Sequence, residues 1–222
     1  MNEILLRNML ISAVLLSGFG ALGTGLVMAT FEVTKDKIEA SEKANLLKNL
    51  HNILPPQSYT NNLLDHKLIV PSDSQLGGKS GSKKTVTIYQ AWQENTPVAV
   101  AFPIVAQNGY SGDIKLLIAI KASGKISGVR VIAHKETPGL GDKIEAAKDD
   151  WIFDFNDKSL NDPGSKLWKV KKDGGVFDQF TGATITPRAI VNAVYKALDY
   201  FNDNQRKLFL DQAKYDQLYG HK

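Results

Sequence analysis

The chain has 222 residues and a mass of 24.4 kDa, enough for one packed domain and an appendage. Its net charge is +4, but lysines alternate with acids and form no basic run, which argues against nucleic-acid binding. Cysteine is absent, which excludes disulfides and thiolate chemistry, and the four histidines stand singly, so no metal site is expected.

The first predicted element is a membrane anchor in residues 1–31. Residues 8–31 carry no charge, and this run is longer than the about 20 residues that cross a bilayer as a helix. A cleaved signal peptide is the alternative, because "VMA" at Val27–Ala29 could serve as its cleavage site. We favour a retained anchor, since the apolar run is long for a signal peptide and no lipoprotein cysteine follows.

Small residues recur every four positions along this span, which would let another transmembrane helix approach closely. They are Ala13, Ser17, Ala21, Gly25 and Ala29. The spacing therefore predicts a helical partner in the membrane. The lysines after the span are interleaved with acids, so charge alone does not decide which side of the membrane the following domain occupies.

Residues 32–56 are predicted to form a juxtamembrane helix and linker. The composition of Glu32–Leu54 is helical, with an apolar stripe in its second half, and Pro55-Pro56 ends the helix. Residues 57–222 then form one domain, in which Gly77–Lys84 is a turn region.

The domain is predicted to be α+β, with an antiparallel sheet covered on one face and flanked by helices. Short connections join consecutive strands, and parallel neighbours would need a long crossover. The expected strands are Thr85–Trp92, Pro97–Val105, Ile114–Ala122 and Ile126–Glu136. The expected helices are Lys143–Asp149, Pro187–Phe201 and a terminal helix from Gln205.

Two loops have unusual composition. In His134–Glu145, glycines flank Leu140, which would let backbone amides approach a flat or anionic ligand. Asp142 stands where a helix N-cap belongs, with Glu145 three residues later. A tight strand-to-helix turn would have the same features.

The second loop is Thr181–Thr186, which precedes a helix. Thr186 is its expected N-cap and Pro187 its first residue. The free amides and dipole of a helix start attract phosphate, although the phosphate-binding Walker pattern is missing. A simple capped helix start explains this spacing equally well.

The run "DQFTGAT", Asp178–Thr184, fits the acceptor pattern Asp-x-x-(Ser/Thr)-Gly-Ala-Thr of flavin transferases, which join FMN through its phosphate to a threonine. With "HKETPGLGDKIE" and the anchor, the chain resembles the G subunit of the Rnf (Rsx) ion-translocating electron-transport complex over nearly its whole length. The C subunit of the sodium-translocating NADH:quinone reductase shares the motif but is usually longer. A cofactor-free, membrane-anchored scaffold domain is a further alternative, but it would not explain two flavin-type loops.

The resemblance implies covalent FMN on Thr184 and a role in electron relay. Asp178 would be recognised by the flavin transferase during maturation. The chain would be a redox subunit without independent catalysis, partnered by other membrane subunits in the bacterial inner membrane, with its flavin domain in the periplasm. Further cofactor contacts would come from both loops: Thr181, Gly182, Ala183 and Thr186 near the phosphate, and Thr137, Pro138, Gly139, Leu140 and Gly141 against the isoalloxazine.

Overall fold

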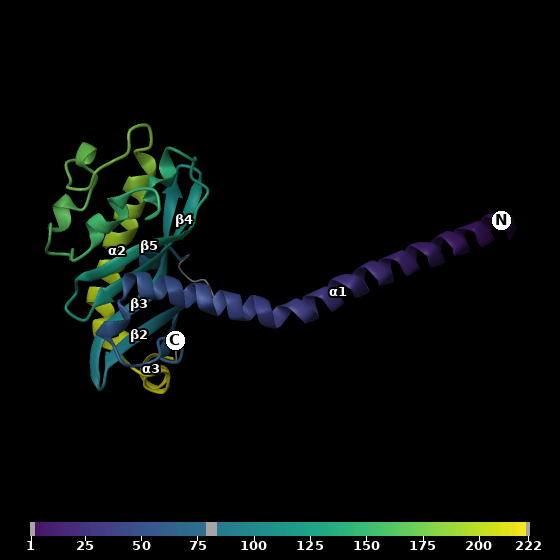
Figure 1. Cartoon of the computed structure of the whole chain (residues 1–222), viewed down its shortest axis with the longest axis horizontal. Coiled ribbons are helices and arrows are strands. Elements are labelled where there is room, and N and C mark those ends of the chain that lie inside the picture. The colour runs from purple at the N-terminus through teal and green to yellow at the C-terminus, as the bar shows by residue number, and fades with distance from the viewer. Residues whose placement is uncertain (1–2, 79–83, 221–222) are drawn as a thin grey trace. The chain divides into compact units, whose positions relative to one another are not determined.

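The computed structural model describes residues 3–78 and 84–220, so residues 79–83 of the predicted Gly77–Lys84 turn lie outside the described part. The chain divides into two compact units, with the boundary between Leu46 and Leu47. Helix α1 spans Glu3–Ile53, so the predicted anchor and the predicted juxtamembrane helix are one continuous helix (Figure 1). It ends just before Pro55-Pro56, as predicted, because proline cannot donate the next helical hydrogen bond.

The N-terminal unit consists of α1 up to Leu46, and residues 8–31 of it are uncharged. Its large side chains are exposed; Leu16 is 77% and Phe19 is 74% accessible. Among the described residues, α1 alone is long and apolar enough to cross a membrane, with a mean hydropathy of 1.9 in its most apolar window. This composition fits a membrane anchor.

The C-terminal unit is built on a five-stranded antiparallel sheet whose spatial order follows the chain. The strands are β1 (Lys67–Pro71), β2 (Thr85–Gln93), β3 (Thr96–Gly109), β4 (Gly112–Lys121) and β5 (Ile126–Ala133). The predicted antiparallel α+β fold is confirmed, and the four predicted strands are present. β1 was not predicted, and β5 ends at Ala133 rather than Glu136.

Both faces of the sheet are covered, although the sequence predicted one covered face. On one face, Phe102, Ile104 and Ile118 belong to the main core with helix α2 (Ile185–Leu208) and a group of aromatic residues. On the other face the strands carry small residues, and a side chain at Gly128 would lie 3.0 Å from the Cα of Ile53. The last turn of α1 therefore packs closely on the sheet.

Helix α2 lies against β3 and begins two residues before the predicted Pro187. It continues past Phe201 to Leu208, where buried Gln90 donates hydrogen bonds of 2.8 Å to the carbonyls of Leu208 and Leu210. The terminal helix α3 is therefore Gln212–Tyr219 rather than a helix from Gln205.

The predicted helix Lys143–Asp149 is wrong. The structure has short 3-10 turns at Gly141–Ile144 and Asp150–Phe155 instead. Asp142 lies inside the first turn, and its carboxylate binds Lys148 rather than capping a helix. Glu145 binds His134 and Lys148, so no capping box forms.

Candidate flavin site

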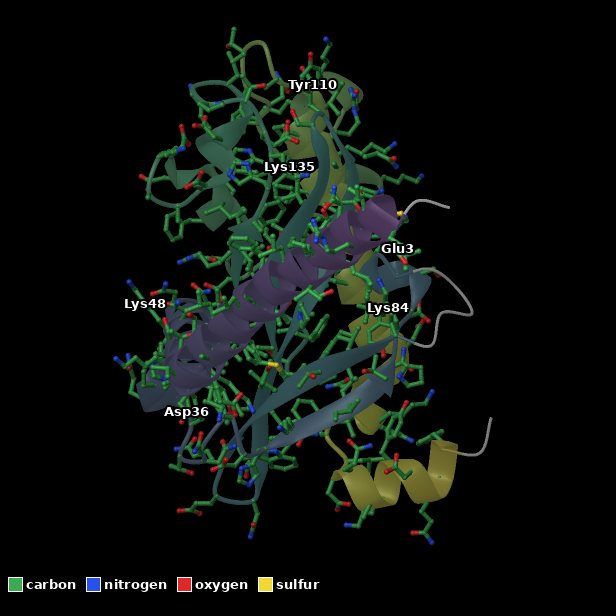
Figure 2. All side chains as sticks on the ribbon, turned by 90° about the vertical axis from the view of Figure 1, so that its right-hand side faces the viewer. Glu3, Asp36, Lys48, Lys84, Tyr110 and Lys135 are labelled. Carbon is green, nitrogen blue, oxygen red and sulfur yellow. The ribbon has the colours of Figure 1, made fainter. Side chains whose placement is uncertain are left out.

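The two unusual loops meet at one cavity of about 260 Å³. The Thr137–Gly141 loop follows β5, and the Thr181–Thr186 loop leads into α2. The turn between β3 and β4 adds Tyr110, which Figure 2 shows at the same end of the domain as Lys135. The lining residues are Tyr110, Glu136, Thr137, Leu140, Gly141, Gly182, Ala183 and Thr186.

Six predicted site residues line this cavity, and four lie beside it. Pro138, Gly139, Thr181 and Thr184 are not among the lining residues. Thr184 is half-buried and occupies the N-cap position of α2 without a side-chain capping hydrogen bond. The motif therefore places one threonine at the helix start with part of its surface open to solvent.

Thr186 has a different environment from the one predicted. It is fully buried, and its hydroxyl donates a hydrogen bond to Oε2 of Glu136. It lies within α2 and does not cap it. Any contact between Thr186 and a phosphate would therefore use its backbone amide, because the hydroxyl already has a partner.

Glu136 was not predicted as a site residue. It is 4% exposed, and the backbone N–H of Ser111 donates a 3.0 Å hydrogen bond to its Oε1. The carboxylate thus joins the β3–β4 turn, the loop after β5 and the start of α2. The only sequence signal was an acid inside an otherwise glycine-rich loop, and its partner Thr186 is fifty positions away.

Glycines make room for this carboxylate. A Cβ at Gly141 would lie 2.9 Å from Oε2 of Glu136 and 3.1 Å from Oγ1 of Thr186. A Cβ at Gly109 would lie 2.9 Å from Oε1. These distances are too short for an ordinary carbon contact. A side chain at Gly141 would displace the carboxylate, whereas one at Gly109 would first meet the backbone carbonyl oxygen of Gly112.

The remaining glycines shape the loops themselves. Gly139 and Gly182 have φ values of 78° and 82°, a backbone conformation that other residues rarely adopt. A Cβ at Gly182 would lie 3.5 Å from Cδ2 of Leu140. The two predicted loops therefore approach each other through Leu140 and Gly182, which both line the cavity.

A charged network supports the loop after β5 from outside the cavity. The backbone N–H of Glu136 donates to Nδ1 of His134, so Nε2 carries the proton and donates to Glu145 at 2.9 Å. Lys148 donates to Asp142 at 2.7 Å. The hydrogen bond from Lys148 lowers the pKa of Asp142, and hydrogen bonds from His134 and then Lys148 lower the pKa of Glu145.

Asp178, the first residue of the acceptor motif, lies on the surface. Its side chain is exposed and pairs with Lys171 at 2.7 Å. Its carbonyl oxygen accepts a 2.8 Å hydrogen bond from Nε1 of Trp151. The motif is therefore fixed through its backbone, while its carboxylate stays accessible to another protein.

A larger cavity of about 600 Å³ flanks another side of α2. Trp168 and Tyr195 contribute aromatic surface, with ring centroids 6.0 Å apart, and Arg188 is paired with Asp173 at 2.6 Å. None of the residues predicted to contact FMN lines it. This cavity is the larger of the two, but the glycine-rich backbone of the two loops makes the smaller cavity the better candidate for a flavin.

Comparison with known proteins decides the family. Residues 109–199 match the FMN-binding domain family, and residues 1–53 match the RnfG N-terminal region. The chain is 43% identical to the G subunit of the ion-translocating oxidoreductase complex of Shewanella amazonensis, over 91% of this chain and 93% of the relative. The chain belongs to this G-subunit family. The corresponding G subunits from Vibrio cholerae and Pseudomonas aeruginosa are 42% and 45% identical over 89% and 91% of this chain, and 92% of each relative.

Membership of the G-subunit family favours the main prediction over the sodium-translocating C subunit and over a scaffold without cofactor. The domain is an FMN-binding domain, and the apolar α1 fits a membrane-anchored protein. The cavity fits a flavin, because backbone of glycine-rich loops and the apolar side chains of Leu140 and Ala183 form its walls. Ligand-enclosing pockets measure about 300–1,000 Å³, so this smaller cavity would leave one edge of the flavin outside.

Proposed function

We propose that this chain is a membrane-anchored electron relay of an ion-translocating oxidoreductase complex and carries FMN through a phosphoester bond on Thr184. The observation that carries the proposal is that the hydroxyls of Thr186 and Thr184 differ in burial and in hydrogen bonding. Thr186 is fully buried, and its hydroxyl already donates a hydrogen bond to Glu136. Thr184 is half-buried, without a side-chain capping bond, at the start of α2.

The start of α2 suits a phosphate. The first amides of a helix have no intrahelical acceptors, and the helix dipole adds positive potential there. A phosphate on Thr184 would lie beside the amides of Ile185 and Thr186. From that point the cavity would receive the isoalloxazine against its wall, to which Leu140 and Gly182 both contribute.

The chemistry in this proposal belongs to the cofactor. FMN accepts and releases one or two electrons, and the protein holds it in position. The chain's own residues bind the phosphate, orient the ring and leave one edge accessible to a donor or acceptor. We expect no side chain to act as acid or base and no independent catalysis by the isolated chain.

Attachment requires a second protein in this proposal. A threonine hydroxyl is a weak nucleophile without an adjacent base, so a flavin transferase would form the bond. Asp178 is exposed and suits recognition by that enzyme. The other subunits of the complex would contact the anchor, in the bacterial inner membrane, with the flavin domain in the periplasm. The predicted division into anchor (1–31), juxtamembrane segment (32–56) and flavin domain (57–222) is part of the proposal.

Mass spectrometry of protein made together with a flavin transferase tests the attachment. The intact chain should be heavier by FMN less one water, and the peptide containing Thr184 should carry the added mass. Thr184→Val should fold and lose the flavin. Thr181→Val and Thr186→Val are matched controls that should keep it. If Thr186→Val loses the flavin and Thr184→Val retains it, the acceptor assignment is wrong.

A further inference from the structure

Glu136 is a charged group in the wall of an otherwise neutral cavity. Of the described residues that line the cavity, Glu136 alone has a charged side chain. It is 4% exposed and receives two hydrogen bonds, from Thr186 and Ser111. The wall of the cavity therefore contains a buried carboxylate and not an exposed acid at its rim.

The hydrogen bonds of Glu136 do not by themselves require a charge at this position. A glutamine of the same shape could accept from Ser111 and bond to Thr186, whereas a buried carboxylate loses its hydration. The loop after β5 nevertheless leaves room for the charged group, because a Cβ at Gly141 would lie 2.9 Å from its Oε2. This combination points to a role for the charge itself.

We propose that Glu136 lowers the reduction potential of the FMN held in this cavity; the inference rests on the proposed function. Each electron that the ring accepts adds one negative charge, which proton uptake only partly balances when the product is an anionic flavin. A fixed carboxylate in a poorly hydrated wall opposes that charge, so reduction becomes less favourable. The hydrogen bonds from Thr186 and Ser111 draw part of the negative charge away from the ring, so Thr186 limits the size of the effect.

Two substitutions with opposite expected effects separate this role from a structural one. Glu136→Gln removes the charge and keeps the shape; its Oε1 can accept from Ser111, and its amide can donate to the Thr186 hydroxyl, which accepts instead. The reduction potential of the FMN in Glu136→Gln should therefore rise. Thr186→Val keeps the charge but removes a donor, so its potential should fall. Glu145→Gln removes a carboxylate outside the cavity lining and should leave the potential unchanged.

The measurement is a spectroelectrochemical titration of the full-length, flavin-loaded protein and the three variants at one pH, with thermal unfolding of each flavin-free protein alongside. Opposite shifts in Glu136→Gln and Thr186→Val support the proposal. Equal potentials, shifts of the same sign, or a shift as large in Glu145→Gln overturn it, whatever happens to the unfolding temperatures.

The proposed function and this inference fail in different ways. A wild-type chain without covalent flavin contradicts the proposed function. If the wild type and only one of the two variants carry covalent FMN, the sign of the shift in that variant's reduction potential decides whether the inference holds. If wild type loads and neither variant does, Glu136 and Thr186 serve attachment rather than potential, and the inference is overturned.

Discussion

Trp151 donates a hydrogen bond from its indole Nε1 to the carbonyl oxygen of Asp178 at 2.8 Å. Its ring also packs edge-on against Phe180, with centroids 5.3 Å apart. Trp151 lies in the 3-10 turn Asp150–Phe155, well before the acceptor motif in sequence, and its one side chain holds the first and third residues of that motif. The motif is thereby fixed to the aromatic part of the core.

Trp151→Phe should weaken this support. It keeps most of the aromatic packing but leaves the Asp178 carbonyl without its donor, which should lower the free energy of unfolding by about 1–3 kcal/mol. Covalent loading by the transferase should slow. Trp168→Phe is a matched control, because Trp168 donates a 3.1 Å hydrogen bond to Ser159 in the same cluster. Equal loading rates in the two variants would contradict a specific role for Trp151.

Leu140→Ala should change the environment of the flavin ring. Leu140 is 45% exposed and lines the cavity, so its truncation should cost little stability but shift the visible absorption spectrum of the bound flavin. Ala189→Leu narrows the larger cavity and should leave the spectrum unchanged. If only Ala189→Leu shifts the spectrum, the ring occupies the larger cavity.

Acid should destabilise the domain through Asp142 and Glu145. Both pKa values are lowered in the folded state, so the stability that these acids contribute is present above their ordinary values of about 4. It is lost as the pH falls through the lower folded values. Lys148→Met removes the ammonium that binds both acids. The urea midpoint of unfolding of this variant should therefore decrease less steeply than that of the wild type as the pH falls below about 4.

The control for the acid experiment is Lys115→Met, which removes an exposed lysine of β4. Its urea midpoint should follow the wild-type pH dependence. Parallel curves for Lys148→Met and wild type would show that the Lys148 network does not govern acid stability.

The anchor should pack through its small residues. Along α1, Gly18, Ala21, Gly25 and Ala29 border a shallow apolar groove. Leucine at Ala21 and Gly25 should fill that groove, so the protein should stay in the membrane but no longer co-purify with other subunits. Val27→Leu, on another side of the helix, should co-purify normally. A mature protein that begins at Thr30 would show that the span is cleaved instead.

Sequence periodicity predicted the elements whose burial follows a regular pattern. Four strands rich in valine and isoleucine were found, but β1 was missed because its five residues end in proline at the edge of the sheet. The helix predicted at Lys143–Asp149 failed because Asp142 and Glu145 bind side chains rather than the backbone. The local sequence pattern alone does not show whether an acidic side chain will bind a backbone amide or another side chain.

The candidate site was predicted as two loops without the contact that joins them. The glycine and threonine patterns indicated the loops, and the structure brings them together at one cavity. Glu136 was missed because its role depends on Thr186 and Ser111, which are distant in sequence. A single sequence carries no signal for such a pairing, whereas the fold creates it directly.

The order of the strands has a consequence for how the protein matures. Each strand pairs with its neighbour in the chain, so the sheet can form from local contacts as the polypeptide becomes available. The cavity differs, because its walls come from residues as far apart as Tyr110 and Thr186 and exist only after α2 has docked. An unfolded chain presents the acceptor motif but no pocket. A flavin whose spectrum reports a protein environment is therefore a marker that this chain has completed folding.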